Sequence, residues 1–170
     1  MRSRPYCENI GNYMKEPYKS VCDVMNKTGL RVSDALRLTV EDIKKRQPYI
    51  HEKKTGKTRR IFISRKLQLQ MLKIAERKNL TDKDFIFAAK PGGKPPARQT
   101  VYRHYKKAAQ AAGIDTKGIS PHSSRKNYVK AKSESGMTVE QIRKKVGHDN
   151  LSTTLLYLYA DQIGGKKKNE

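Results

Sequence analysis

Pro121-His122-Ser123-Ser124-Arg125 is followed along the chain by Gly147-His148-Asp149-Asn150 and then by Tyr157. Two imidazoles, a guanidinium and a phenol therefore occur within one short C-terminal segment. Taken alone, each of these side chains is more often structural than functional. Together, in a strongly basic chain, they indicate a site that binds and processes phosphate.

The net charge of the 170-residue chain is +22, from 38 lysine and arginine residues against 16 aspartate and glutamate residues. Such an imbalance is self-repelling, and a polyanion that neutralises it releases condensed counterions. Nucleic acid is therefore the expected partner. An anionic membrane surface competes as an explanation, but it would favour one basic amphipathic helix, whereas basic residues occur here in every segment.

The apolar content of 35% predicts one domain with a thin core shared by several amphipathic elements. The sequence has neither an apolar run of membrane-spanning length nor a signal peptide, so we expect a soluble, cytoplasmic protein without a membrane partner. Cys7 and Cys22 lie in no metal-type spacing and are expected to be free thiols.

Hydrophobic periodicity predicts a mostly helical α+β fold. We expect a helix over 17–27 that stops at Gly29, and a second helix that begins at 31–34 with Ser33 as its N-cap and ends at 42–43. A capping box of Thr138 and Gln141 opens a later helix. Further helices are expected at 67–75, 97–112, 121–135, 138–146 and 151–160, with a breaker-rich loop at 90–96.

The period of the sequence changes between the second and third expected helices. Residues 48–52 and 58–63 are short β-type runs on either side of Lys53-Lys54-Thr55-Gly56-Lys57. This pattern predicts an antiparallel β-hairpin with Gly56 in its turn.

Breaking a DNA phosphodiester without a metal ion requires four chemical groups. A nucleophile attacks in line, cations neutralise the non-bridging oxygens, an acid protonates the leaving oxygen, and a base takes the proton of the nucleophile. Arginine suits the second task because its planar guanidinium matches two phosphate oxygens and stays charged. Tyrosine suits the first where a reversible phosphoester is needed.

Six residues in this order along the chain resemble the catalytic set of the tyrosine recombinases, the phage-integrase family. The resemblance covers Pro17 to Tyr159 and implies an α+β, mostly helical catalytic domain with a small antiparallel sheet. No single motif is specific, but the whole ordered set is. Its members are Arg31 in Thr28-Gly29-Leu30-Arg31-Val32-Ser33-Asp34, Lys54 in the hairpin, His122 and Arg125 as His-x-x-Arg, His148 after Gly147, and Tyr157 nine residues later.

The resemblance implies a role for each member of the set. Arg31 and Arg125 would clamp the scissile phosphate, and His148 would donate a hydrogen bond to one of its oxygens. Tyr157 would attack and leave a 3′-phosphotyrosine link. Because that link conserves the bond energy, the resemblance implies neither ATP nor a metal ion or other cofactor.

The proton-transfer roles follow from the same resemblance. Lys54 would protonate the departing 5′-hydroxyl, and His122 would act as general base or hydrogen-bond partner near the phosphate. Lys53 and Lys57 stay open as the acid because they share the turn with Lys54. Tyr159 competes with Tyr157; the two lie roughly 200° apart on a helix, so one is expected to pack while the other points at DNA.

The sequence departs from the family pattern in three places. Ser124 stands where a large apolar residue is usual, which could loosen the helix that carries Arg125, and Lys126 stands where histidine is common. The chain also has no room for the separate N-terminal helical domain of most members. A short natural recombinase and a catalytic fragment would both fit, and the high positive charge would compensate for the weaker DNA binding expected without that domain.

Our interpretation is a site-specific recombinase for integration, excision or inversion, in the DNA-associated cytoplasm of a bacterial, phage or mobile-element host. We expect an arm at 1–16, a catalytic domain at 17–160 and a basic flexible tail at 161–170. Expected partners are duplex DNA with a specific site, a homo-tetramer on that DNA, and accessory DNA-bending proteins. Additional DNA contacts are expected from one helix through Arg98, Arg103, Lys106 and Lys107.

Three other functions compete with this interpretation. A non-catalytic DNA-binding regulator could retain the fold, but the catalytic set would then be expected to have degraded. A general basic RNA- or DNA-binding protein would explain the charge but leave the ordered set to coincidence. A type IB topoisomerase shares the chemistry, and the short chain argues against it.

Overall fold

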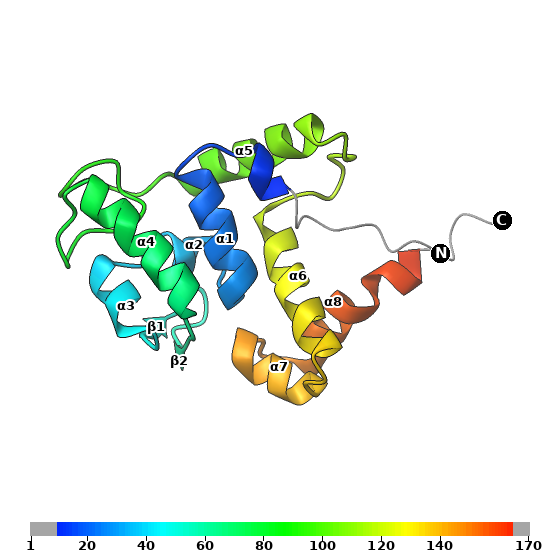
Figure 1. The fold of residues 1–170 in the computed structure, drawn as a ribbon. Coiled ribbons are helices and arrows are strands. Elements are labelled where there is room, and N and C mark those ends of the chain that lie inside the picture. The colour runs from blue at the N-terminus through cyan, green and yellow to red at the C-terminus, as the bar shows by residue number, and fades with distance from the viewer. Residues whose placement is uncertain (1–9, 165–170) are drawn as a thin grey trace.

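The structure, a computed structural model, describes residues 10–164, with side chains described through residue 159. It is mostly helical with one two-stranded antiparallel sheet, as the sequence predicts (Figure 1). In chain order the elements are η1 (Ile10–Tyr13), α1 (Tyr18–Thr28), α2 (Val32–Ala35), α3 (Val40–Lys45), β1 (Tyr49–His51), β2 (Thr58–Arg60), α4 (Arg65–Arg77), α5 (Arg98–Ala111), α6 (Pro121–Glu134), α7 (Val139–Val146) and α8 (Leu151–Gly164).

Two apolar clusters hold the fold together. The larger one joins η1, α1 to α5, β1 and the segment after β2, and its fully buried members include Met25, Leu38 and Phe87. The smaller one joins α6 and α7 through Tyr128 and Val146, with α8 packed beside them. Figure 1 shows α7 and α8 next to the lower part of α6, away from α3 and α4. The two clusters meet where α1 packs against α6.

Gly29 makes this meeting of α1 and α6 possible. It ends α1 in the left-handed region, with φ of 68°. A Cβ atom at this position would lie 2.5 Å from the ring of Tyr128 on α6. Both the backbone conformation and the close approach therefore require glycine, and they bring the next residues, including Arg31, next to α6.

The second helix predicted from the sequence is wrong in its extent and its cap. Arg31, not Ser33, is the N-cap residue of the short α2, and a separate α3 begins after Thr39. Thr39 and Asp42 form a capping box, in which Thr39 Oγ1 accepts from the Asp42 amide at 3.2 Å. Thr39 has an extended backbone and forms an isolated antiparallel bridge with Phe85. A single helix therefore cannot run from α2 through Thr39 into α3.

The predicted hairpin is confirmed, with shorter strands than expected. Tyr49 pairs with Arg60 and His51 with Thr58, and the turn closes through a hydrogen bond from the Gly56 amide to the Glu52 carbonyl at 2.9 Å. The capping box of Thr138 and Gln141 at the start of α7 is also confirmed.

The chain ends differ from the sequence prediction where they are described. Ile10, within the arm expected at 1–16, lies in η1 and is fully buried in the larger cluster. At the other end, α8 continues to Gly164. Residues 1–9 of the predicted arm, with Cys7, and residues 165–170 of the predicted tail lie outside the described residues. Within 10–164, none of the helices has the length and apolar character that crossing a bilayer requires.

Candidate active site

Arg31 lies between the hairpin and the C-terminal end of α7. Its guanidinium donates from Nη1 to Glu52 Oε2 at 2.5 Å and from Nη2 to the Gly147 carbonyl at 3.2 Å. Glu52, which directly follows β1, also accepts from Arg59 Nε at 2.6 Å and from Thr55 Oγ1 at 2.9 Å. Arg31 is thus fixed from both halves of the chain.

Arg125 is buried on α6, with 1% of its surface exposed. Its Nη1 donates to the Gly29 carbonyl at 2.8 Å and its Nη2 to the Val146 carbonyl at 2.5 Å. Burial, followed by the positive charges of Arg31 and Arg59, lowers the pKa of Arg125 to about 10. The guanidinium is still charged at neutral pH.

The two guanidiniums bind consecutive carbonyls at the end of α7, directly before His148. The second of these carbonyls belongs to Gly147, which has φ of 67°. A Cβ atom on Gly147 would lie 2.7 Å from Glu52 Oε1. The Gly-His pair noted in the sequence therefore has a structural reason: only glycine lets α7 end against the carboxylate that holds Arg31.

His148 is buried beside these arginines. Its Nδ1 lies 2.8 Å from Thr154 Oγ1 on α8. Burial, followed by the charges of Arg125 and Arg31, lowers the pKa of His148 to about 4, so its ring is neutral at physiological pH. If the Thr154 hydroxyl donates to Nδ1, the proton of the neutral ring is on Nε2, where it is available to a phosphate oxygen.

Tyr157 faces this group from α8. Its ring stands edge-on to that of His148, with centroids 5.1 Å apart and planes at 67°. Lys126 Nζ lies 5.8 Å from the centroid of the Tyr157 ring. Tyr159, in contrast, is exposed. Of the two candidate nucleophiles, Tyr157 is the one that the structure brings to the other predicted site residues.

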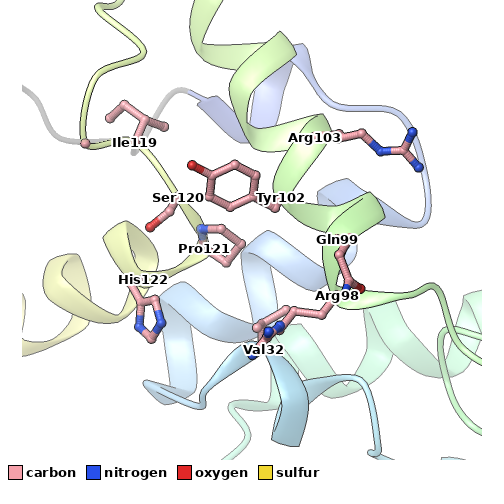
Figure 2. Close-up of a pocket in the computed structure, with 10 residues that line it drawn as sticks. Val32, Arg98, Gln99, Tyr102, Arg103, Ile119, Ser120, Pro121 and His122 are labelled. Atoms are coloured by element: carbon pink, nitrogen blue, oxygen red, sulfur yellow. The ribbon is translucent and has the colours of Figure 1, made fainter.

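His122 lies in the first turn of α6, at the edge of the same site. Its side chain is exposed, and desolvation on its protein-facing side, followed by the charges of Arg125 and Arg31, lowers its pKa, which favours the neutral form that a general base needs. His122 also lines a pocket of about 620 Å³ between α5 and the start of α6. Figure 2 shows Tyr102 of α5 facing Ser120 across this pocket.

Lys54 is exposed at the tip of the hairpin. Its neighbour Lys57 forms an ion pair with Asp149, the residue after His148, at 2.5 Å. This pairing lowers the pKa of Asp149, and Lys54 acts on Asp149 in the same direction through its charge. The hairpin tip therefore lies at the α7–α8 connection, and Lys57 is already engaged there.

The four basic residues predicted to bind DNA from α5 differ in their surroundings. Arg98, Arg103 and Lys107 are exposed. Arg98 also lines the pocket beside His122 and lowers the pKa of that histidine. Lys106 donates from Nζ to the Thr116 carbonyl, so its amine is already bound to the protein.

Ser124, the departure next to Arg125, belongs to a buried polar contact. Its Oγ lies 2.8 Å from the Tyr105 hydroxyl on α5 and 3.7 Å from Cys22 Sγ on α1. Burial raises the pKa of the Cys22 thiol, which keeps it neutral. The hydroxyl of Ser124 thus ties α6 to two helices, and the helix is not left unanchored by the missing apolar side chain.

Sequence reasoning missed the carboxylates of the site. Glu52 and Asp34 are each 1% exposed, and Asp34 Oδ1 accepts from the Lys53 amide at 3.1 Å. The signal for Glu52 was its position two residues after the buried Ile50, which puts it on the inward side of the strand alternation. A charged residue at an inward position next to a basic turn indicates a partner in the interior.

The assembled groups can neutralise an anion and hold a phenol beside it. Among the described residues, no three His, Cys, Asp or Glu side chains are grouped as ligands for a metal ion. Positive charge in the site comes from Arg31, Arg125 and Arg59, with Glu52 as the nearby carboxylate.

Comparisons with known proteins identify the family and the fold of the chain. The model of the phage integrase family matches residues 6–162. The tyrosine recombinase XerD of Staphylococcus saprophyticus is 25% identical over 152 residues, which cover 85% of this chain and 50% of XerD.

Two solved structures share the fold. A crystal structure of XerA recombinase superposes with a TM-score of 0.75 at 17% identity, over 99% of this chain and 65% of XerA. XerH site-specific recombinase bound to its difH substrate, in a pre-cleavage complex, gives a TM-score of 0.69 at 17% identity, over 96% of this chain and 51% of XerH. The chain spans about half the length of the curated relatives it matches.

Proposed function

Because the chain belongs to the phage integrase family, we propose that it is a site-specific DNA recombinase that acts through a covalent 3′-phosphotyrosine link at Tyr157. One observation carries this proposal. The guanidiniums of Arg31 and Arg125 bind consecutive carbonyls directly before His148, and the His148 ring lies 5.1 Å from the Tyr157 ring.

The scissile phosphate would be bound by Arg31 and Arg125. A guanidinium has five N–H donors, and the hydrogen bonds to protein acceptors leave others for the two non-bridging oxygens. His148, neutral because its pKa is about 4, would add a hydrogen bond from Nε2 to one of these oxygens. The site then counters the negative charge that develops on phosphorus-bound oxygen in the transition state.

Cleavage would proceed with a balanced transfer of protons. Tyr157 Oη attacks phosphorus and loses its proton to His122, whose lowered pKa favours the base form. The bond between phosphorus and O5′ breaks, and O5′ receives a proton from Lys54 Nζ. Joining is the reverse: a 5′-hydroxyl attacks the phosphotyrosine, Tyr157 departs, and each proton returns.

The partners follow from the reaction. Exchange between two duplexes cuts four strands with one tyrosine each, so four copies of the chain would assemble on duplex DNA that carries a specific site. Accessory DNA-bending proteins could help to bring the sites together. The net charge of +22 supports binding to a polyanion.

A nicked suicide duplex tests the proposal. The recognition duplex is first selected from a random-sequence pool by binding to the purified chain, and is then nicked beside the cleavage position so that the 5′-hydroxyl fragment is lost. In EDTA and without ATP, we expect a covalent adduct through the 3′-phosphate at the end of the cleaved strand, and joining of that strand to an added 5′-hydroxyl strand.

Other outcomes would identify the competing functions. Specific binding without any adduct contradicts the proposal and favours a non-catalytic regulator. If the protein forms the adduct and relaxes supercoiled DNA but never joins a second duplex, the result favours a topoisomerase.

A further inference from the structure

Glu52 is the carboxylate that joins the two halves of the candidate site. It is 1% exposed and follows the last residue of β1, on the hairpin that also carries Lys54. Both of its oxygens are used: Oε2 accepts from Arg31 and from Thr55, and Oε1 accepts from Arg59. No sequence motif pointed to this residue.

The partners of Glu52 lead to the His148 side of the site. Arg59 donates from Nη1 to the Lys145 carbonyl at 2.6 Å, near the end of α7. Arg31 donates to the carbonyl of Gly147, two residues further along the chain. Gly147 itself packs against Glu52 Oε1 so closely that no side chain fits between them. The carboxylate therefore holds the hairpin on the end of α7.

Glu52 has the charge state that this role needs. Burial alone would raise its pKa, but the hydrogen bonds from Arg59, Arg31 and Thr55 outweigh burial and lower the pKa. The group is therefore ionised at neutral pH, and it stands between two cations, so the local charge stays positive for a phosphate.

A carboxylate against Arg31 could instead occupy the place of the phosphate and inhibit the site. The geometry favours a permanent support. The Glu52 amide donates to the Lys57 carbonyl and its own carbonyl accepts from Gly56, so the residue is part of the closed turn. Its side chain could leave Arg31 only by also releasing Thr55 and Arg59.

We propose that Glu52 is a positioning residue for strand cleavage: it orients the Arg31 guanidinium and sets the hairpin that carries Lys54 against His148. This inference rests on the proposed recombinase function. It adds Glu52 to the residues that the reaction needs, in a role that involves no contact with the DNA.

The first test replaces Glu52 by glutamine. An amide can accept from one arginine but presents an NH2 group to the other, so Arg31 loses its fixed orientation. We expect Glu52→Gln to slow adduct formation on the nicked duplex by about 100-fold, the effect of a small misplacement of a catalytic group. DNA affinity should be equal or slightly higher, because a negative charge is removed. Glu41→Gln, at an exposed ion pair on α3, is the matched control and should cleave like the wild type.

A second variant keeps the test valid if Glu52→Gln folds poorly. Thr55→Val removes one donor to Glu52 and leaves the carboxylate in place. We expect about a fivefold slower cleavage, as for the removal of one hydrogen bond. Unchanged or faster cleavage by Glu52→Gln would overturn the inference, and faster cleavage would mean that the carboxylate competes with phosphate.

A double-mutant cycle separates positioning from general damage to the fold. If Glu52 acts in part through Arg31, the Glu52→Gln penalty should be clearly smaller in an Arg31→Ala background, with the part that acts through Arg59 and the hairpin remaining, whereas purely additive penalties would reject the inference.

Arginine side-chain NMR of the DNA-free protein gives a readout that is independent of cleavage. The Arg31 guanidinium protons should exchange slowly in the wild type and faster in Glu52→Gln. If the wild type forms no adduct, the proposed function fails, and this NMR difference still decides whether Glu52 fixes Arg31.

Discussion

Thr154 and Tyr157 lie one turn apart on α8, and both face His148: Thr154 Oγ1 lies 2.8 Å from His148 Nδ1, and the Tyr157 ring stands edge-on to the imidazole at 5.1 Å. One helix thus carries the proposed nucleophile, Tyr157, and also orients the histidine beside it. Any movement of α8 would displace both groups together. The two groups of the candidate site that depend on α8 are therefore positioned together.

The buried His148 predicts a loss of stability in acid. Its pKa is about 4 in the folded chain against an ordinary value of 6.5, so between these values the unfolded chain binds a proton that the folded chain does not. The free energy of unfolding should therefore fall as pH decreases from 7 to 4, by at most about 3 kcal/mol from this residue.

Urea denaturation at several pH values measures this effect. In His148→Gln the decrease should be smaller by the His148 contribution, and His122 and His104, whose pKa values are also lowered, would account for part of the remainder. Equal pH dependence in the wild type and in His148→Gln would contradict the assignment.

Lys54 as the general acid predicts rescue by a better leaving group. Lys54→Ala should slow cleavage by about 100-fold or more on a normal duplex. A duplex with sulfur in place of the bridging O5′ releases a thiolate, which needs no proton, so this variant should then cleave at close to the wild-type rate. Lys53→Ala and Lys57→Ala are the matched controls. If Lys57→Ala, and not Lys54→Ala, cleaved the normal duplex slowly and the sulfur-containing duplex at the wild-type rate, Lys57 would be the general acid.

The exposed basic residues of α5 predict a change in the salt dependence of DNA binding. Arg103→Gln and Lys107→Gln should each reduce the slope of log K against log salt by about 1 if each contacts one phosphate. Lys106→Gln is the control, because Lys106 already donates to the Thr116 carbonyl. Identical slopes for the wild type, Arg103→Gln and Lys107→Gln would exclude α5 from the DNA interface.

Because Tyr105 and Ser124 are in contact, we expect substitution of either residue to lower the free energy of unfolding. Tyr105→Phe removes a hydroxyl 2.8 Å from Ser124 Oγ and should lower the free energy of unfolding by about 1 kcal/mol. Ser124→Leu restores the side chain usual in the family but overpacks this place, at a cost of about 2 kcal/mol. Urea midpoints at constant m-value measure both, with the exposed Tyr102→Phe as control. A stabilised Ser124→Leu would contradict this description of the core.

The sequence predicted those elements whose signals are local. The capping box of Thr138 and Gln141 and the turn around Gly56 depend on residues a few positions apart, and the structure confirms both. The break between α2 and α3 was missed although Thr39 and Asp42 form a local capping box; the second contact that fixes the break is a bridge from Thr39 to the distant Phe85. No short window of the sequence contains that contact.

The candidate site shows the same division. Tyr157 and His148 could be named from their order and spacing, and the structure brings their rings together. Glu52 had only a weak local signal, its inward position two residues after Ile50, because its importance comes from Arg31, which lies 21 residues earlier, and from the packing of Gly147 against its carboxylate. Long-range ion pairs and close backbone approaches leave little trace in a single sequence.

The most direct test of the recombinase account is the covalent adduct formed by Tyr157→Phe and by Tyr159→Phe on the nicked suicide duplex. The account predicts that Tyr157→Phe binds the duplex with wild-type affinity and forms no adduct. Tyr159→Phe should form the adduct at the wild-type rate, and mass spectrometry should find the nucleotide on the peptide that contains Tyr157. An adduct that persists in Tyr157→Phe would contradict the account.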